Sequence, residues 1–205
     1  CRALTLRRTG RVDEAHADCT EAVALTRDIG YRWGEASARA ILGIVLHQRG
    51  DLEGARFQML TSIDQSMALG DSWVRSISTA NLAISVLMPR GEFDLALTYL
   101  EEGDRLLQVV GDNLNRATSF AMRAEIARVL GDAAKADVLL REALALAREM
   151  GDSYGIGHAL RLLGVQAVDA GDAERAVHLL REALAEMSRM GGASDMAACL
   201  DGCVD

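Results

Sequence analysis

The sequence is poor in proline and aromatic residues, and it lacks a long apolar run. It contains 1 proline, 3 phenylalanines, 3 tyrosines and 2 tryptophans among 205 residues. An all-β sandwich needs frequent turns and aromatic strands, so this composition excludes that class. The longest uninterrupted apolar stretch covers residues 40–46, whereas crossing a bilayer takes roughly 20 residues. No basic segment followed by an apolar core stands at the start, so we expect no signal peptide.

Basic charge is also scarce. The chain has 22 basic and 30 acidic residues, which gives a formal net charge of −8. Such a chain binds nucleic acids and anionic membranes poorly, so we expect neither as a direct partner. Half of the residues are hydrophobic and a quarter are charged, a balance that excludes a disordered chain.

The chain has few cysteines and no recognisable catalytic motif. Cysteines stand at positions 1, 19, 199 and 203, which is not a disulfide framework, so we expect a reduced, cytoplasmic setting. Phosphate loops, dinucleotide fingerprints and metal-binding or nucleophile motifs are missing. We therefore expect no enzyme, no metal and no cofactor. The chain opens and closes inside helical patterns, which suggests an excerpt of a longer protein.

Glycine, in contrast, is plentiful and regularly spaced. One column consists of Gly10, Gly50, Gly91, Gly131 and Gly171, and a second of Gly30, Gly70, Gly111, Gly151 and Gly191. The spacing within each column is 40 or 41 residues, and an alanine stands five residues after each glycine of the first column. Strong helix formers fill the segments between glycines. In residues 132–150, apolar residues recur every three or four positions, which predicts a helix with one apolar face.

The turns predict how these helices pack. The dipeptide Gly-Asp occurs at six turns, where glycine ends one helix and aspartate caps the next. Capping explains these aspartates without an active site. Helices of roughly 17 residues joined by two- or three-residue turns must fold back on each other. We expect an all-α, right-handed superhelical solenoid of about five antiparallel helix hairpins plus a partial helix from residue 193. The predicted repeats of this single domain, 1–205, are 1–30, 31–70, 71–111, 112–151, 152–191 and a partial 192–205.

The pattern resembles a tetratricopeptide repeat (TPR). The resemblance rests on a small residue seven before the turn glycine (Gly43, Ala124 and Gly164), on that glycine, and on the alanine five residues later. The period of 40 residues is longer than the usual length of about 34. Ile84 replaces the small residue in the third repeat, which also holds the extra residue and Pro89. We expect an irregular helix there.

A narrower resemblance comes from phrases such as LLREALALAREMGD at residues 139–152. It is similar to the C-terminal repeat regions of large ATP-binding transcription regulators of the LuxR and SARP types in actinobacteria. The resemblance implies a non-enzymatic sensor or interaction module for a peptide, a protein segment or a small effector. Nucleotide binding and DNA binding would lie outside this segment.

The TPR resemblance also implies that the first helix of each pair lines a concave face. Counting back 13, 10, 6 and 3 residues from each turn glycine gives one stripe per helix, which we call the inner stripe. Asn81, Arg128 and Arg161 on it are suited to holding backbone or carboxylate groups of a peptide. The candidate ligand-binding residues on the inner stripe are Arg7, His47, Ser78, Asn81, Ser85, Glu125, Arg128, His158 and Arg161.

Several alternatives stay open. The inner stripe is also compatible with a solvated groove that binds nothing. The chain is also compatible with a peptide receptor or scaffold unrelated to transcription, or with self-association (a homo-oligomer) through the end helices 1–9 and 193–205. Trp33, Trp73, Leu114 and Tyr154 each stand three residues after a glycine of the second column. We interpret them as a packing column rather than as a stacking ladder for a ligand.

Overall fold

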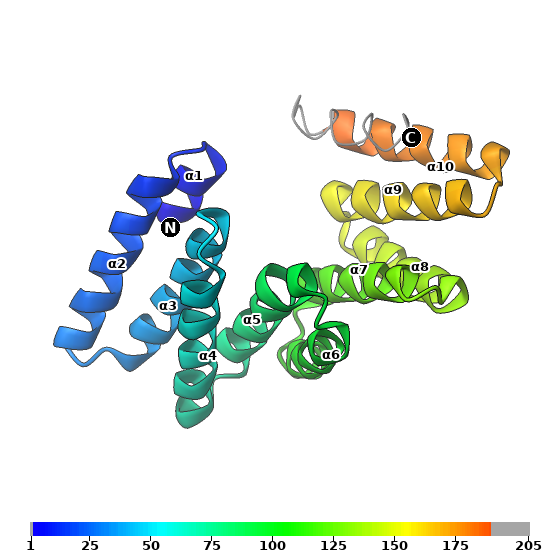
Figure 1. The fold of residues 1–205 in the computed structure, drawn as a ribbon. Coiled ribbons are helices and arrows are strands. Elements are labelled where there is room, and N and C mark those ends of the chain that lie inside the picture. Colours follow the sequence, from blue (N-terminus) through cyan, green and yellow to red (C-terminus); the bar gives the residue numbers. More distant parts are fainter. Residues whose placement is uncertain (1, 190–205) are drawn as a thin grey trace. The chain divides into compact units, whose positions relative to one another are not determined.

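The computed structural model describes residues 2–189, and all of its regular structure is helical (Figure 1). The chain divides into two compact units, Cys1–Gly111 and Asp112–Asp205. We describe them separately as unit 1 and unit 2. Consecutive helices pack as antiparallel pairs in both, which confirms the predicted all-α, TPR-like repeat fold.

Unit 1 contains three helix pairs. Its elements are α1 (Arg2–Arg8), α2 (Val12–Asp28), α3 (Arg32–Gln48), α4 (Leu52–Leu69), α5 (Ser72–Leu82), the π-helix η1 (Ala83–Leu87), the 3₁₀ turn η2 (Met88–Arg90) and α6 (Phe93–Val110). The pairs are α1 with α2, α3 with α4, and α5 together with η1 against α6. We call α1, α3 and α5 first helices, and α2, α4 and α6 second helices.

Unit 2 contains two pairs among its described residues. They are α7 (Asn113–Val129) with α8 (Ala133–Met150), and α9 (Ser153–Asp169) with α10 (Ala173–Ser188). The first helices are α7 and α9. The partial helix expected from residue 193 lies outside the described residues. The right-handed superhelix and the single-domain interpretation stay predictions.

The predicted turn chemistry is confirmed. Nine glycines of the two columns, Gly10 to Gly171, adopt left-handed φ angles between 66° and 83°, a conformation that glycine tolerates without steric cost. All six Gly-Asp aspartates accept a hydrogen bond from the backbone N–H three residues later, at 2.7–3.1 Å. Each cap satisfies a donor that the start of a helix leaves free.

The irregularity predicted near Pro89 is a π-helix. The third repeat has one residue more than its neighbours, and η1 accommodates it by widening one turn of the helix. Pro89 follows in η2, and Gly91 ends the segment with a φ of 73°. The insertion therefore shifts the register of everything before it in this helix.

Small residues allow the helices of each pair to approach closely. The column alanines Ala15, Ala55, Ala96, Ala136 and Ala176 are all at most 3% exposed. A Cβ added at Gly43 would lie 2.6 Å from Met59 Cγ, and one added at Gly164 would lie 2.7 Å from Leu180 Cγ. Both distances are far below a normal carbon contact, so the predicted close approach at these glycines is confirmed.

Candidate functional site

In unit 1 the inner stripe carries unpaired polar atoms on two neighbouring helices. Arg7 on α1 and His47 on α3 each stand three residues before a turn glycine, so they share a register. Both side chains are half-buried. Arg7 Nε and His47 Nδ1 are buried and have no hydrogen-bond partner among the described residues. Leaving a buried polar atom unpaired costs about 1–3 kcal/mol. A ligand group that paired with either atom would recover that energy.

Asn81 and Ser85 lie on the third first helix, around the start of η1. Asn81 is half-buried and makes no hydrogen bond within residues 2–189. Ser85 is 7% exposed, because the π-helix turns this position towards the packed side of the helix. Of the two, Asn81 is therefore the accessible polar group.

Ser78 requires a correction. It is completely buried, and its Oγ lies 2.8 Å from Ser62 Oγ on α4. The sequence register was counted back from Gly91, and the extra residue in η1 shifts that count by one. Counted forward from the preceding glycine, Ser78 matches Ser119 of unit 2, which is also buried. Ser78 thus packs against α4 and is not part of the accessible stripe.

In unit 2 the inner stripe carries more charged residues, namely Glu125, Arg128 and Arg161. Arg128 on α7 is exposed and forms an ion pair with Asp169 at the end of α9, with Nη1 3.2 Å from Oδ2. Glu125 and Arg161 are half-buried, and neither forms a hydrogen bond or ion pair within residues 2–189. Arg128 is therefore already neutralised, whereas Glu125 and Arg161 are available to a ligand.

His158 belongs to the same stripe and is neutral at pH 7. Its ring stacks on Tyr154, with centroids 6.1 Å apart and planes 4° from parallel. Burial, and secondarily the charge of Arg161, lower the pKa of His158 from 6.5 to about 4. A neutral imidazole both donates and accepts a hydrogen bond, so it offers no fixed positive charge to a ligand.

The aromatic column is an exposed edge rather than a buried wedge. Trp33, Trp73, Leu114 and Tyr154 are 42–50% exposed. The Trp33 indole reaches towards the next first helix, where its Nε1 donates to Oδ2 of the capping residue Asp71 at 2.7 Å. We expected these side chains to pack against the previous repeat, but Trp33 contacts the next repeat, and about half of each of the four side chains faces solvent.

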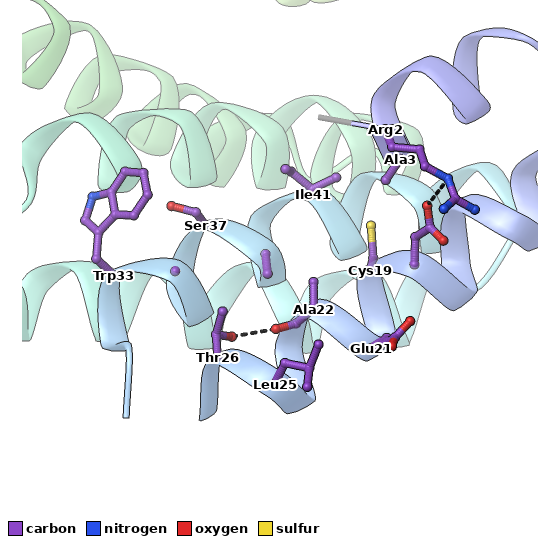
Figure 2. Close-up of a pocket in the computed structure, with 13 residues that line it drawn as sticks. Arg2, Ala3, Cys19, Glu21, Ala22, Leu25, Thr26, Trp33, Ser37 and Ile41 are labelled. Atoms are coloured by element: carbon purple, nitrogen blue, oxygen red, sulfur yellow. Dashed lines mark hydrogen bonds and ion pairs between the residues drawn. The ribbon is translucent and has the colours of Figure 1, made fainter. Parts of the chain in front are cut away.

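A hollow of unit 1, about 530 Å³ in volume, lies beside α1, and we call it the α1–α3 hollow (Figure 2). The start of α1, the second half of α2 and the first half of α3 form its walls, and the Arg2–Asp18 ion pair lies at one end. Burial raises the pKa of the Cys19 thiol to about 11, so this thiol is protonated and not nucleophilic. Ala22 and Ile41 are other members of a lining that is mostly apolar.

The repeat explains this hollow. One repeat further along, the matching positions include Met59, Ser62 and Ser78, which are 0% exposed. Ser62 Oγ donates to the Ala36 carbonyl in the first half of α3 at 2.7 Å, and Ser78 Oγ lies beside it. The positions that line the α1–α3 hollow therefore belong to a helix-packing surface of the repeat.

A buried polar cluster in unit 1 was not assigned any role from the sequence. Glu35 and Arg39 on α3 are 8% and 6% exposed. Arg39 donates from Nε and Nη2 to Glu35 Oε1 at 3.0 and 2.7 Å, and from Nη1 to Gln58 Oε1 at 2.6 Å. Arg27 on α2 donates from Nε to the same Glu35 oxygen at 3.3 Å. We call these four residues the Glu35–Arg39 cluster.

The cluster keeps its carboxylate ionised. Burial raises the pKa of Glu35, but hydrogen bonds from Arg39, Gln65 and Arg27 outweigh it, so the net pKa lies below the ordinary value. The sequence signal was a Glu and an Arg four residues apart, which usually indicates a solvated ion pair on a helix surface. Burial of this pair depends on residues of α2 and α4, so the spacing alone could not reveal it.

No three His, Cys, Asp or Glu side chains within residues 2–189 come together to hold a metal ion. Within the same range, no helix combines the length and apolar character needed to cross a membrane.

No protein-family model matches the chain, and no curated protein matches it significantly. Several solved structures match the chain in fold. A Rap protein complexed with competence and sporulation factor has a TM-score of 0.82 and 13% identity over 98% of this chain. A signal transduction ATPase with a tetratricopeptide repeat sensor from Pyrococcus horikoshii has a TM-score of 0.80 and 14% identity over 98%. A TPR protein from Thermus thermophilus has a TM-score of 0.70 and 18% identity over 99%.

These likenesses concern the fold. The chain spans 96% of the Thermus protein, but only 61% of the Rap protein and 30% of the ATPase. Identities of 13–18% leave the ligand residues of those proteins untransferable. Together with the helix pairing, the comparisons establish that this chain has a TPR-like helical repeat fold.

Proposed function

We propose that this chain is a non-enzymatic sensor or interaction module that binds a peptide or protein segment on the inner stripe of its first helices. The observation that carries the proposal is the pair of buried, unpartnered atoms Arg7 Nε and His47 Nδ1, in one register on neighbouring helices. A peptide carbonyl would accept from the Arg7 Nε–H. His47 Nδ1 would pair with a backbone N–H or a carbonyl, depending on its tautomer.

Asn81 lies beside the proposed site on the third first helix. It precedes the extra residue of η1, so counted forward from Gly70 it matches Ile41 and Met122 and stands one position off the inner stripe. A side-chain amide offers both a donor and an acceptor, which suits an extended peptide backbone. A Rap protein in complex with competence and sporulation factor supports binding by a similar fold.

A peptide library tests the proposal. Fluorescent peptides of about six residues would be titrated against the wild type and an Arg7→Ala/His47→Ala/Asn81→Ala variant. We expect a selected peptide to bind at least about tenfold more weakly to the variant, which is about 1.4 kcal/mol. Arg105→Ala, an exposed arginine on α6, is the matched control and should bind normally. Failure to select any peptide, or equal binding by the triple variant, would refute the site.

We also propose that the module belongs to a bacterial transcription regulator. This step rests on the resemblance of residues 139–152 to the repeat regions of LuxR-type and SARP-type regulators, and the sensor repeats of the ATPase from Pyrococcus horikoshii support a signalling role. Ligand binding would then bias attached nucleotide-binding and DNA-binding parts. Reading the complete gene tests it: a parent that lacks both parts would contradict the proposal.

A further inference from the structure

A second hollow in unit 1 opens between α2 and α4, with α3 as its floor. Its volume is about 450 Å³, within the range of small-molecule pockets. Val23 and Leu42 provide apolar walls, Phe57 lines it from α4, and Arg27, Arg39 and Gln58 bring in the Glu35–Arg39 cluster. We call it the α2–α4 pocket. Its lining does not include the unpaired inner-stripe residues of unit 1, so it is a separate surface from the proposed peptide site.

The cluster in this pocket carries more positive than negative charge. Two guanidinium groups, Arg27 and Arg39, donate to a single carboxylate, Glu35. The formal charges therefore sum to about +1, since both arginines are permanently protonated. Arg39 uses three of its N–H groups on Glu35 and Gln58, and a guanidinium has five. The Arg27 side chain is 57% exposed and donates from Nε, so its two terminal nitrogens remain for another acceptor.

The last helix pair shows that the fold does not need this cluster. The positions five and nine residues after the second-column glycine, and eight after the first-column glycine, hold Ile156, Leu160 and Leu179 in the α9–α10 pair, and Arg116, Phe120 and Leu139 in the α7–α8 pair. Ile156, Leu160 and Leu179 belong to the apolar core of unit 2 or pack against it. Replacing a buried ion pair by apolar residues of similar volume is often neutral or stabilising. Packing alone therefore gives no reason for a cationic cluster at this place.

The other repeat junction of unit 1 shows balanced charge instead. There, Arg75 takes the position of Glu35 and pairs with Glu102 on α6. One guanidinium faces one carboxylate at that junction. The other junction of unit 1 thus lacks the surplus charge of the α2–α4 pocket.

We propose that the α2–α4 pocket binds a small organic carboxylate with an apolar or aromatic body. The carboxylate would accept from the free N–H groups of Arg27 and Arg39, which gives charge-assisted hydrogen bonds and neutralises the surplus. The body would lie against Val23, Leu42 and the 63% exposed Phe57. The pocket should therefore bind an anion more tightly than a neutral molecule of the same shape.

The test uses 4-phenylbutyrate and the neutral 4-phenylbutanol as probes. Each is titrated to about 10 mM, a range that detects millimolar affinity, into ¹⁵N-labelled protein while the arginine Nε–H and backbone amide signals are followed. We expect the carboxylate to shift the Arg27 and Arg39 signals and to bind at least about tenfold more tightly than the alcohol. No shift with the carboxylate, or equal binding of both probes, would overturn the proposal.

Two variants separate the pocket from the fold. Arg27→Gln removes the surplus charge but keeps the buried Glu35–Arg39 pair, and should weaken 4-phenylbutyrate binding about tenfold. Arg27→Gln/Glu35→Ile/Arg39→Leu/Gln58→Leu copies the apolar residue types of the α9–α10 pair and removes both guanidinium groups, so the chain should fold while its preference for the carboxylate disappears. If both variants bound the carboxylate as tightly as the wild type, the pocket would not be the site.

Discussion

Unit 1 and unit 2 bury different kinds of side chain within the same arrangement of helix pairs. The buried polar residues of unit 1 are Glu35, Arg39, Ser62, Ser66, Ser76, Ser78, Thr79 and Ser85, whereas Ser119 is the buried polar residue of unit 2 within residues 2–189. Alanine and leucine make up most of the core of unit 2. The helices themselves are alike, with first helices of 17 residues in α3, α7 and α9.

The difference separates what the fold requires from what it tolerates. Both units share the left-handed turn glycines, the capping aspartates and the column alanines. These features set where helices end and how closely they pack. The residues between them vary from charged to apolar without altering the pairing. Polar residues that the packing does not require are therefore the best guide to function, and unit 1 holds most of them.

The largest expected effect comes from breaking the buried pair of unit 1. Glu35→Ala leaves the Arg39 guanidinium buried without its carboxylate, which should cost about 3–5 kcal/mol of the free energy of unfolding. Tryptophan fluorescence in a denaturant titration measures this, because both tryptophans, Trp33 and Trp73, lie in unit 1. Glu142→Ala, which removes an exposed carboxylate of unit 2, is the control and should cost little. A loss below about 1 kcal/mol for Glu35→Ala would show that Arg39 is stabilised by something else.

A second prediction tests a feature that the two units share. Gly164→Leu would overpack against Leu180, and Gly43→Leu against Met59. Each should cost on the order of 1–3 kcal/mol or more, measured by far-ultraviolet circular dichroism during thermal unfolding. Ala145→Leu at an exposed position of α8 is the matched control. An unchanged melting temperature in both glycine variants would mean that the paired helices are not closely packed at these positions.

The third prediction concerns pH and is confined to unit 2. The unfolded chain takes up a proton on His158 near pH 6.5, but the folded state resists it until about pH 4. Stability should therefore fall as pH falls through that window, by up to about 3 kcal/mol. His158→Thr, which introduces the residue type of position 118, should flatten this dependence, whereas the exposed His178→Thr should not. An unaltered slope in the His158 variant would contradict the assignment.

Much of the fold could be predicted from spacing alone. Glycines every 20 or 21 residues and aspartates after them determine the helix ends locally, so the helix pairs and the capping bonds followed directly from the sequence. The extra residue of the third repeat and Pro89 also indicated where a helix would be irregular. Helix ends and capping bonds depend on residues within a few positions of each other, so the sequence alone is enough to predict them.

The candidate site was harder to predict, because burial depends on residues far away in the chain. Ser78 was placed on the accessible stripe, since nothing in the sequence shows which turn absorbs the extra residue. The burial of Arg39 depends on packing against Gln58, 19 residues away. Nothing in the sequence around Arg128 indicated its ion pair with Asp169, which lies 41 residues away. Hydrogen-bond partners across repeats decide which polar side chains remain free.

The most direct test of this account is the stability of the Glu35→Ile/Arg39→Leu/Gln58→Leu variant, which gives unit 1 the apolar residue types of the α9–α10 pair of unit 2. Denaturant unfolding followed by tryptophan fluorescence would be compared with that of the wild type. If packing does not require the cluster, the variant should fold and be equally stable or more stable, by up to about 4 kcal/mol. A variant that unfolds or loses several kcal/mol would show instead that the cluster holds unit 1 together, and would contradict its assignment to ligand binding.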